Sequence, residues 1–385
     1  MKGFIDKYLH KLSSQGLCGY DGAIFIALDD VPYSNRPINS SLLKVFELIH
    51  INTLLIARPS EPYLSSIIGV LRANDDVDKI IPADCETRTF FHDIPVIDND
   101  SPENIAKALS NRKAALFRDG RIVSCGTVSP EQAYIAFSSV CFSLFVKYLF
   151  DGLKGSVGDI KPVLEGIIRL LPQKVYLTQT YDTELPLKHT PRDHNEAIRQ
   201  IVSVGKAMVD LRLVDSYFGN ISCLVNDSIY ITQTGSSMDE IAQAIDIIPL
   251  RGGSTTGITA SSEFSAHRAI YERTDLRFIL HGHPKFAVIM SMHCHYTSCR
   301  GDNCYRACDK ERHIGESPIV SGEIGTGTYG LLNTVPKAML NKGRAIVYGH
   351  GVFVGSREGF QEALRDMIEI ERYCFKQYMD LIRAP

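Results

Sequence analysis

The chain has 385 residues and a formal net charge of −3, with 44% hydrophobic and 22% charged residues. This composition is typical of a soluble globular protein, and the length favours about two domains. The near-neutral charge provides no basic surface for nucleic acid or for an acidic membrane, so we expect neither partner. The N-terminus has no long apolar stretch of the kind found in signal peptides, which favours a cytoplasmic protein.

The first half of the chain opens with a helix, a turn and a strand. Apolar periodicity predicts a helix over 4–14, and a glycine turn leads into a strand over 23–28. The later run 133–150 is apolar and has roughly the length of a membrane span. It contains serines and Lys147 and lies within a patterned chain, so we expect a buried helix.

The second half repeats this order of elements after a polar stretch, 183–193, that contains two prolines. We therefore predict domains at 1–185 and 186–385. The predicted elements of the second domain are a helix over 194–211, strands over 221–225 and 228–232, a helix over 263–272, a strand over 345–348 and a terminal helix. Mixed helices and strands of this kind predict a layered α/β domain.

Four short segments recur in the same order in the two halves, which indicates a duplicated domain. They pair 20–30 with 217–227, 59–61 with 261–263, 76–81 with 275–280, and 115–120 with 346–351. In this alignment the second half carries polar residues and histidines that the first half lacks. The differing pairs are Asn220 with Ala23, Ser222 with Phe25, His281 with Pro82, His283 with Asp84, and His350 with Asp119. We therefore interpret the first half as a degenerate copy with a structural role.

Three histidines of the second half stand at the ends of predicted strands. His281 and His283 are two residues apart, so on a strand their side chains point to the same face. His350 follows another apolar strand and precedes a glycine. Three histidines with an open fourth position are typical of a catalytic zinc site, although histidines are also often simply packed or exposed.

Glu263 opens a predicted helix directly after two serines. Serine suits the helix N-cap and a carboxylate is stabilised by the helix dipole, and neither role prevents Glu263 from acting as a base. His267 lies one turn later on the same face, and we expect it to be a structural hydrogen-bonding residue. Three stretches have the small and polar residues of an anion site, although each alone is typical of an ordinary turn. They are Gly219–Asn220, Thr234–Gly235 and Ser261–Ser262.

As an ordered set, the segments GNIS, ITQTG, SSEFSAHRAIY, HGHP and YGHGVFVG resemble the class II aldolase/adducin family over about residues 194–378. The resemblance implies an α/β fold of two tandem α/β/α layered class II aldolase-like domains, each with a mainly antiparallel central sheet flanked by helices. It also implies a homo-oligomer, because family members often assemble with sites between subunits. We expect the first copy to pack where the family uses a second subunit.

By the same resemblance, the second copy holds Zn²⁺ or another divalent metal and acts on a small phosphorylated ketose or hydroxy-ketone. The implied roles are metal ligation by His281, His283 and His350, proton transfer by Glu263, and substrate or phosphate binding by Gly219, Asn220, Thr234, Gly235, Ser261 and Ser262. Such a metal can stabilise the enediolate that forms when a C–C bond breaks, so the implied activity is that of an aldolase-type lyase. A decarboxylase, dehydratase or epimerase of the same family is an alternative, and so is a non-catalytic adducin-like interaction protein.

The segment 293–313 is the part of the second half that least resembles the family. It contains four of the ten cysteines, namely Cys294, Cys299, Cys304 and Cys308. Their spacing fits no usual zinc signature, so ordinary thiols, a second metal or iron–sulfur site, and disulfides all stay open. Asp302 and Tyr305 are candidates for the residue that protonates the aldehyde in the family.

Overall fold

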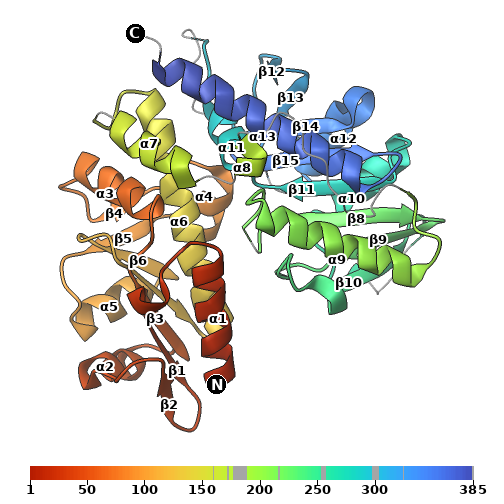
Figure 1. Cartoon of the computed structure of the whole chain (residues 1–385). Coiled ribbons are helices and arrows are strands. Elements are labelled where there is room, and N and C mark those ends of the chain that lie inside the picture. Colours follow the sequence, from red (N-terminus) through yellow and green to blue (C-terminus); the bar gives the residue numbers. More distant parts are fainter. Residues whose placement is uncertain are drawn as a thin grey trace. The chain divides into compact units, whose positions relative to one another are not determined.

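The structure is a computed structural model that describes residues 1–158, 160–170, 173–176, 189–215, 217–252, 257–296, 303–323 and 325–383. The chain divides into two compact units, Met1–Leu170 and Leu171–Pro385 (Figure 1). This division lies nearer the N-terminus than the predicted boundary between 185 and 186. Each unit contains one sheet with helices on both faces, which confirms the predicted α/β class.

The first unit is built around a seven-stranded sheet with the order β2-β1-β3-β7-β6-β5-β4. Strands β5 and β6 are parallel, and the other neighbouring strands are antiparallel. The strands are β1 (Ala23–Leu28), β2 (Pro32–Ser34), β3 (Thr53–Ala57), β4 (Lys79–Ile80), β5 (Ile94–Ile97), β6 (Ala114–Phe117) and β7 (Ile122–Gly126). The helices are α1 (Lys2–Ser14), α2 (Ser40–Leu48), α3 (Tyr63–Ala73), α4 (Cys85–Phe91), α5 (Pro102–Leu109), α6 (Pro130–Leu153) and α7 (Lys161–Leu170).

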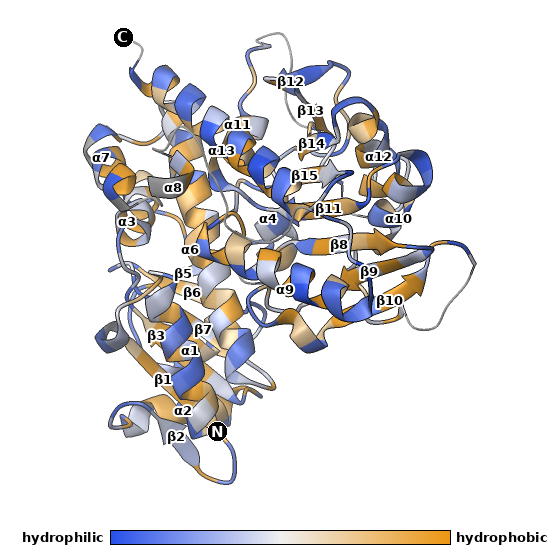
Figure 2. Cartoon of the chain, turned by 45° about the vertical axis from the view of Figure 1, so that its right-hand side comes forward, coloured by the Kyte–Doolittle hydropathy of each residue, from blue (hydrophilic) through white to orange (hydrophobic). Residues whose placement is uncertain are grey.

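Helices cover both faces of this first sheet. On one face, apolar residues of α2 and α5 pack with Ile26, Leu54 and Val123 in one buried cluster. On the other face α6 packs on β3, β6 and β7, and α1 and α3 pack on α6. Helix α6 is long and apolar enough to cross a membrane by length and composition, but 89% of its most apolar window is buried. Its orange colour in Figure 2 is that of a core helix, as predicted.

The second unit repeats this architecture with an eight-stranded sheet, in the order β10-β9-β8-β11-β15-β14-β13-β12. Here β13 and β14 are parallel, and the other neighbours are antiparallel. The strands are β8 (Asn220–Val225), β9 (Ser228–Thr232), β10 (Ile245–Pro249), β11 (Phe278–Gly282), β12 (Arg312–Ile314), β13 (Ser317–Val320), β14 (Arg344–Val347) and β15 (Gly351–Ser356). The helices are α8 (Gln173–Tyr176), α9 (His194–Asp210), α10 (Phe264–Arg273), α11 (Lys285–Met292), α12 (Leu331–Lys342) and α13 (Phe360–Arg383).

The two faces of the second sheet carry different helices. Helices α10 and α12 share one buried cluster with Ile231, Ile279 and Phe353 of the strands. Helix α13 packs on β11 and β15, and it contacts α9 and α11. Because successive side chains of a strand point to opposite faces, the same strands serve both cores. The predicted α/β/α layering with a mainly antiparallel sheet is therefore confirmed.

The two units share one topology, which bears out the duplication. If β10 is set aside, β1 to β7 take the places of β8, β9, β11, β12, β13, β14 and β15 in the same sheet order. The helices on the faces correspond as well, α2 and α5 to α10 and α12, and α1, α3 and α6 to α9, α11 and α13. The parallel pair β5–β6 occupies the place of β13–β14.

The topology corrects two of the four sequence pairings. Strand β11, which carries His281, corresponds to β3 and not to the region of β4, so Pro82 and Asp84 are not the counterparts of the histidines. Because Asn220 pairs with His281 and Ala23 pairs with Ala57, the counterpart of His281 is Ala57. The sequence alignment failed because 76–81 and 275–280 have similar residue patterns, although they contain β4 and the start of β11, which lie in different places of their sheets.

The same correction applies to Glu263. The pairing of 59–61 with 261–263 is wrong, because α3 corresponds to α11 and α10 corresponds to α2. Glu263 is the N-cap residue of α10, and the N-cap residue of α2 is Asn39. His350 lies in the turn between β14 and β15, and Asp119 lies in the equivalent turn between β6 and β7, which agrees with the fourth pairing. The first unit thus lacks the carboxylate and all three histidines.

The first unit also lacks most of one connection. In the second unit, β9 and α10 are separated by β10 and by the segment that ends in Ser261–Ser262. In the first unit, β2 ends at Ser34 and α2 begins at Ser40. The turns that contain Thr234, Gly235 and the two serines therefore have no counterpart in the first unit.

Candidate active site

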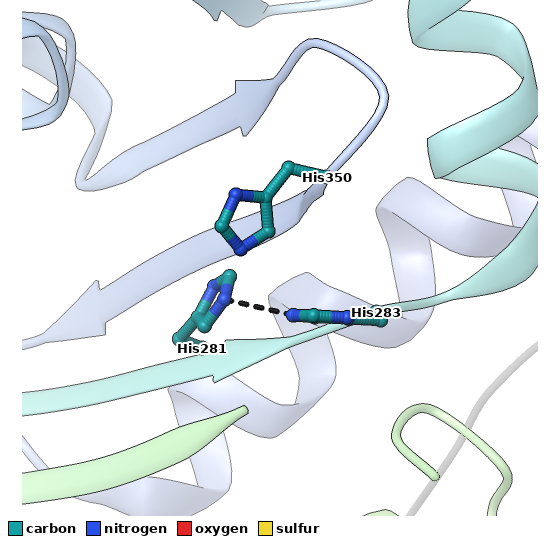
Figure 3. A group of neighbouring side chains, drawn as sticks. All are labelled: His281, His283 and His350. Atoms are coloured by element: carbon teal, nitrogen blue, oxygen red, sulfur yellow. Dashed lines mark hydrogen bonds between the residues drawn. The ribbon is translucent and has the colours of Figure 1, made fainter. Parts of the chain in front are cut away.

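Three buried histidines meet where the central strand β11 ends and the neighbouring strand β15 begins. His281 lies near the end of β11, His283 follows that strand, and His350 lies in the turn before β15. Their rings point toward one another, with His281 on β11, His283 just beyond the end of that strand, and His350 opposite (Figure 3). The Nε2 atoms of His281 and His283 are 3.0 Å apart, and one ligand atom from each of the three rings lies within 4.8 Å of the others. This is the only such group among the residues that the structure describes.

Glycines allow the strands to approach closely enough to bring these rings together. A Cβ atom on Gly351 would lie 2.4 Å from the carbonyl oxygen of Gly282 and 2.8 Å from Cδ2 of His283. Gly219, with a φ of 97°, would place a Cβ 2.5 Å from the carbonyl oxygen of His281. These distances are below any real contact of a Cβ, so larger residues would push the histidines apart. Packing alone thus explains why residue 219 is a glycine, and the role of Gly219 in substrate binding stays a prediction.

Burial keeps the strand histidines neutral. Burial lowers the pKa of His281 to about 4, and burial together with the neighbouring histidines lowers the pKa of His283 well below its ordinary value. The Nδ1 atom of His281 lies 3.1 Å from the carbonyl oxygen of Val352, which accepts a hydrogen bond only from the Nδ1–H tautomer. The lone pair of His281 is therefore on Nε2, where it faces the other two rings.

The carboxylate of Glu263 lies against the three histidines. Its Oε2 atom is 3.3 Å from Nε2 of His281, and its Oε1 atom is 3.2 Å from Nε2 of His350. Glu263 is 7% exposed and it is the N-cap residue of α10, where the helix dipole favours a negative charge. Burial acts to raise the pKa of Glu263, but His281, His350 and the Asn220 amide outweigh it and lower the pKa below its ordinary value.

A chain of buried polar side chains continues behind Glu263. The Nδ2 atom of Asn220 donates to Oε2 of Glu263 at 2.7 Å, and the Oδ1 atom of Asn220 lies 2.5 Å from Nε2 of His267. The Oγ atom of Ser222 is 2.7 Å from Nδ1 of His267 and 2.7 Å from the hydroxyl of Tyr271. The predicted hydrogen-bonding role of His267 is thereby confirmed, with partners in β8 that the sequence could not name.

Two members of this chain were missed as site residues, although the sequence contained a signal for each. Ser222 belongs to the segment in which the two copies differ most, where Phe25 replaces it. Tyr271 follows His267 by one helical turn, so the two side chains lie on the same face of α10. Polar residues at one face of a helix that packs on a sheet are unusual in a core, and they therefore indicate a buried polar network.

The residues predicted to bind phosphate fall into two groups. Thr234, Gly235 and Ser262 are exposed, and the Oγ1 atom of Thr234 accepts a 2.8 Å hydrogen bond from the backbone N–H of Ser262. Ser261 is buried, and its Oγ accepts a hydrogen bond from the N–H of Glu263 at 3.3 Å. Asn220 is 4% exposed and both ends of its amide are already engaged within the protein.

The helix that follows His283 is fixed by a buried carboxylate that the sequence did not reveal. Glu371 of α13 is fully buried and accepts hydrogen bonds from the backbone N–H groups of Phe286 and Ala287, at 3.0 and 2.8 Å. The hydroxyl of Tyr176 in α8 donates to the same carboxylate at 2.5 Å. Since the first N–H groups of a helix have no partner within the helix, Glu371 caps α11 directly behind the histidines.

The cysteine-rich segment forms no metal cluster in the part of it that the structure describes. Cys294 and Cys308 are exposed and Cys304 is buried, and none of the three forms a disulfide. Cys299 and Asp302 lie outside the described residues, so the four-cysteine set stays a prediction. Tyr305 is exposed, and its backbone carbonyl oxygen accepts a hydrogen bond from Ser321.

A cavity of about 730 Å³ in the first unit has a different place in the fold. Its lining includes Leu48 and Phe90, and also Ile51 and Thr127. These two residues flank the end of the sheet at which β3 begins, whereas Ala57, the counterpart of His281, stands at the opposite end of β3. The cavity is therefore not a remnant of the histidine site.

Comparisons with known proteins concern the second unit. Residues 199–378 match the model of the "Class II Aldolase and Adducin N-terminal domain" family. L-fuculose-1-phosphate aldolase from Thermus thermophilus is 21% identical with a TM-score of 0.40, over 50% of this chain and 100% of that chain. Sugar-phosphate aldolase from Thermotoga maritima is 18% identical with a TM-score of 0.37, over 50% of this chain and 98% of that chain. No curated protein matches the chain. The second unit of this chain belongs to the class II aldolase and adducin family.

Proposed function

We propose that the second unit is a metal-dependent lyase of the aldolase type, which cleaves a small phosphorylated ketose or hydroxy-ketone. The observation that carries the proposal is the contact of one buried carboxylate, Glu263, with the three buried histidines. Buried ionisable groups are costly unless they are paired or used, and the first unit keeps the same sheet without any of them. The fold therefore does not require these four residues.

The histidine set fits a zinc ion. Three buried imidazoles with converging ring nitrogens, one of them with its tautomer fixed by a carbonyl oxygen, are what Zn²⁺ binds in catalytic sites. The absence of a side chain at Gly351, where a Cβ would lie 2.8 Å from His283 and 2.9 Å from His281, gives the rings room to converge. His281, His283 and His350 would hold the ion, and a bound Zn²⁺ supplies a Lewis acid that polarises the carbonyl and hydroxyl oxygens of a substrate.

Glu263 is the proposed acid/base. It is ionised and lies beside the histidines, where it can accept a proton from a substrate hydroxyl and return it to carbon. Because its backbone begins α10 and its carboxylate is bound by Asn220, the carboxylate is held in one place during the transfer.

The proposed phosphate site is the exposed turn formed by Thr234, Gly235 and Ser262. Two small hydroxyl side chains and positive-φ glycine backbone at one turn are the ingredients of an anion site. Ser261 joins this turn to Glu263, because its Oγ atom accepts a hydrogen bond from the backbone N–H of Glu263. A phosphate bound at the turn would therefore set the distance between the reacting carbon and Glu263.

The test is a metal assay combined with a substrate screen on the full chain. We expect about one zinc ion per chain by elemental analysis, as one three-histidine site would hold. We also expect cleavage of at least one phosphorylated ketose in a panel that also contains aldehydes and 3-keto acids. His281→Ala should lose both metal and activity, and Glu263→Gln should keep the metal and lose activity. The matched control is His194→Ala, which changes an exposed histidine of the same unit.

The outcomes separate the competing functions. Loss of CO₂ from a keto acid, water elimination or epimerisation, with the same dependence on Glu263, would replace the lyase by a decarboxylase, dehydratase or epimerase. Absence of stoichiometric metal, together with absence of activity on every substrate of the panel, would overturn the proposal that the chain is an enzyme. It would favour an adducin-like interaction protein.

We propose further that the first unit is non-catalytic and structural. At the positions of Asn220, Glu263 and His281 it has Ala23, Asn39 and Ala57. His→Ala substitution of all histidines in the first unit should leave metal content and activity unchanged. Loss of bound metal in that variant would contradict the proposal.

A further inference from the structure

The four polar residues behind Glu263 form one continuous hydrogen-bond chain with a single direction. Asn220 donates from Nδ2 to Oε2 of Glu263 at 2.7 Å, and its Oδ1 atom faces His267 and can only accept. His267 must then carry its proton on Nε2, and its Nδ1 atom accepts from Ser222. The hydroxyl of Ser222 in turn accepts from the hydroxyl of Tyr271. Each donor in this order has one acceptor.

The surroundings make this direction stable. His267 and Ser222 are fully buried, Asn220 is 4% exposed and Tyr271 is 5% exposed. Burial lowers the pKa of His267 to about 3 and raises the pKa of Tyr271 well above its ordinary value, so both are uncharged at neutral pH. The chain joins two elements, β8 and α10, and its direction is set at one end by the Asn220 amide, which donates from Nδ2 to Glu263.

The first unit shows that the fold does not need this chain. At the same places of the same strand, β1 has Ala23 and Phe25 instead of Asn220 and Ser222, and both are buried and apolar. Phe25 is 0% exposed, so its ring fills the place in the first unit that Ser222 occupies in the second. Buried polar groups that an apolar core can replace are costly to keep for packing alone.

We propose that Tyr271, Ser222, His267 and Asn220 are positioning residues that hold Oε2 of Glu263 and so make Oε1 the oxygen that exchanges the substrate proton. This inference rests on the proposed function of Glu263. Oε2 lies 3.3 Å from Nε2 of His281 and accepts the Asn220 amide, whose hydrogen cannot be given up, whereas Oε1 lies 3.2 Å from Nε2 of His350. The chain thereby fixes both the rotation of the carboxylate and the different roles of its two oxygens.

The experiment compares two substitutions of His267 in the full chain. Gln can donate to Asn220 and accept from Ser222, so His267→Gln should keep kcat within about threefold of wild type, whereas His267→Leu should lower kcat about 100-fold with little change in KM. Tyr271→Phe and Ser222→Ala should give smaller losses, about 3- to 10-fold, because the chain is cut further from Glu263. Zinc content should stay at the wild-type value in all four variants. The control is Tyr373→Phe, which changes an exposed tyrosine of the same unit.

A second readout does not depend on activity. ¹⁵N spectra of the histidine side chains should show His267 as the neutral Nε2–H tautomer at neutral pH, assigned by its loss in His267→Gln. Ser222→Ala should shift the Nδ1 signal, because that atom loses its donor. If His267→Leu does not fold, the other three variants and the spectra still test the positioning role of the chain.

The failures can be told apart. An active wild type whose kcat is unchanged in His267→Leu, or a His267→Gln variant as impaired as His267→Leu, would overturn the positioning role and leave the proposed function standing. An Nδ1–H tautomer would overturn the direction of the chain. A wild type with no metal and no activity on any substrate would remove the proposed function, and the inference with it.

Discussion

The cap of α11 by Glu371 gives the sharpest stability prediction. Glu371→Leu removes the acceptor of three buried donors, the N–H groups of Phe286 and Ala287 and the hydroxyl of Tyr176. Glu371→Gln keeps the shape and one acceptor oxygen, but its NH₂ group must face at least one of the same donors. The two variants therefore differ in the number of buried donors that lose their partner.

The magnitude follows from these donors. A buried donor without a partner costs about 1–3 kcal/mol. We expect Glu371→Leu to lower the free energy of unfolding by about 3–5 kcal/mol, because losses within one network are not additive. Glu371→Gln should cost about 1–2 kcal/mol. Burial raises the pKa of Glu371, so the native state binds its proton more tightly than the unfolded state. Its contribution to stability is full below the ordinary carboxyl pKa and is lost as the pH rises through the raised value, and Glu371→Gln should remove this trend.

The assay is urea unfolding of the full chain followed by far-UV circular dichroism, since the chain has no tryptophan to serve as a fluorescent probe. Hydrogen exchange of peptides from α11 reports the same change locally, with about tenfold faster exchange for each 1.4 kcal/mol. The matched control is Glu369→Gln, the same substitution at an exposed site of the same helix. If Glu371→Leu unfolds at the urea concentration of the control and keeps α11 protected, the capping argument is refuted.

Three further predictions follow from the second unit. Gly351→Ala would place a methyl group 2.4 Å from the carbonyl oxygen of Gly282, so we expect it to lose most of the bound zinc in elemental analysis after dialysis, and full occupancy would contradict the geometry. Burial lowers the pKa of His267 to about 3, so the unfolded chain binds its proton first, and the stability contribution of this residue is full above pH 6.5 and is lost as the pH falls toward 3. The stability of His267→Gln should accordingly decline less than that of wild type over this range, which acid unfolding curves would measure. Cys294 is exposed and Cys223 is buried with a raised pKa, so a thiol reagent followed by peptide mass spectrometry should label the first quickly and the second only after unfolding. Labelling of both cysteines at the same rate would contradict the burial of Cys223.

The sequence was sufficient for several of the elements and for the three histidines and Glu263, which meet at the site. Period-two apolar runs and glycine turns placed β1 and β8, and β1 covers the predicted range 23–28. The spacing of His281 and His283 determined that both rings face one side, because a strand alternates its side chains. The resemblance to the class II aldolase/adducin family was carried by ordered motifs, and the family model confirms it over 199–378.

The alignment of the two copies could not be decided from sequence. Short segments such as 76–81 and 275–280 have similar sequences although they belong to different strands of the fold. The pairing based on sequence similarity therefore placed Pro82 opposite His281. Only the hydrogen-bonded register, in which Asn220 meets His281 and Ala23 meets Ala57, identified the true counterparts. Register depends on long-range pairing, and local composition does not encode it.

Residue types and spacing by themselves indicated the α/β class, the duplicated organisation and the three histidines as a candidate metal site, and the resemblance to the class II aldolase/adducin family joined Glu263 to them. The tertiary structure decided which side chains surround that carboxylate. Ser222 and Tyr271 are 49 residues apart in the chain and share a hydrogen bond, and Tyr176 reaches Glu371 across 195 residues. Such partners come together only when strands and helices pack, because a buried polar group takes whichever partner the fold brings within reach.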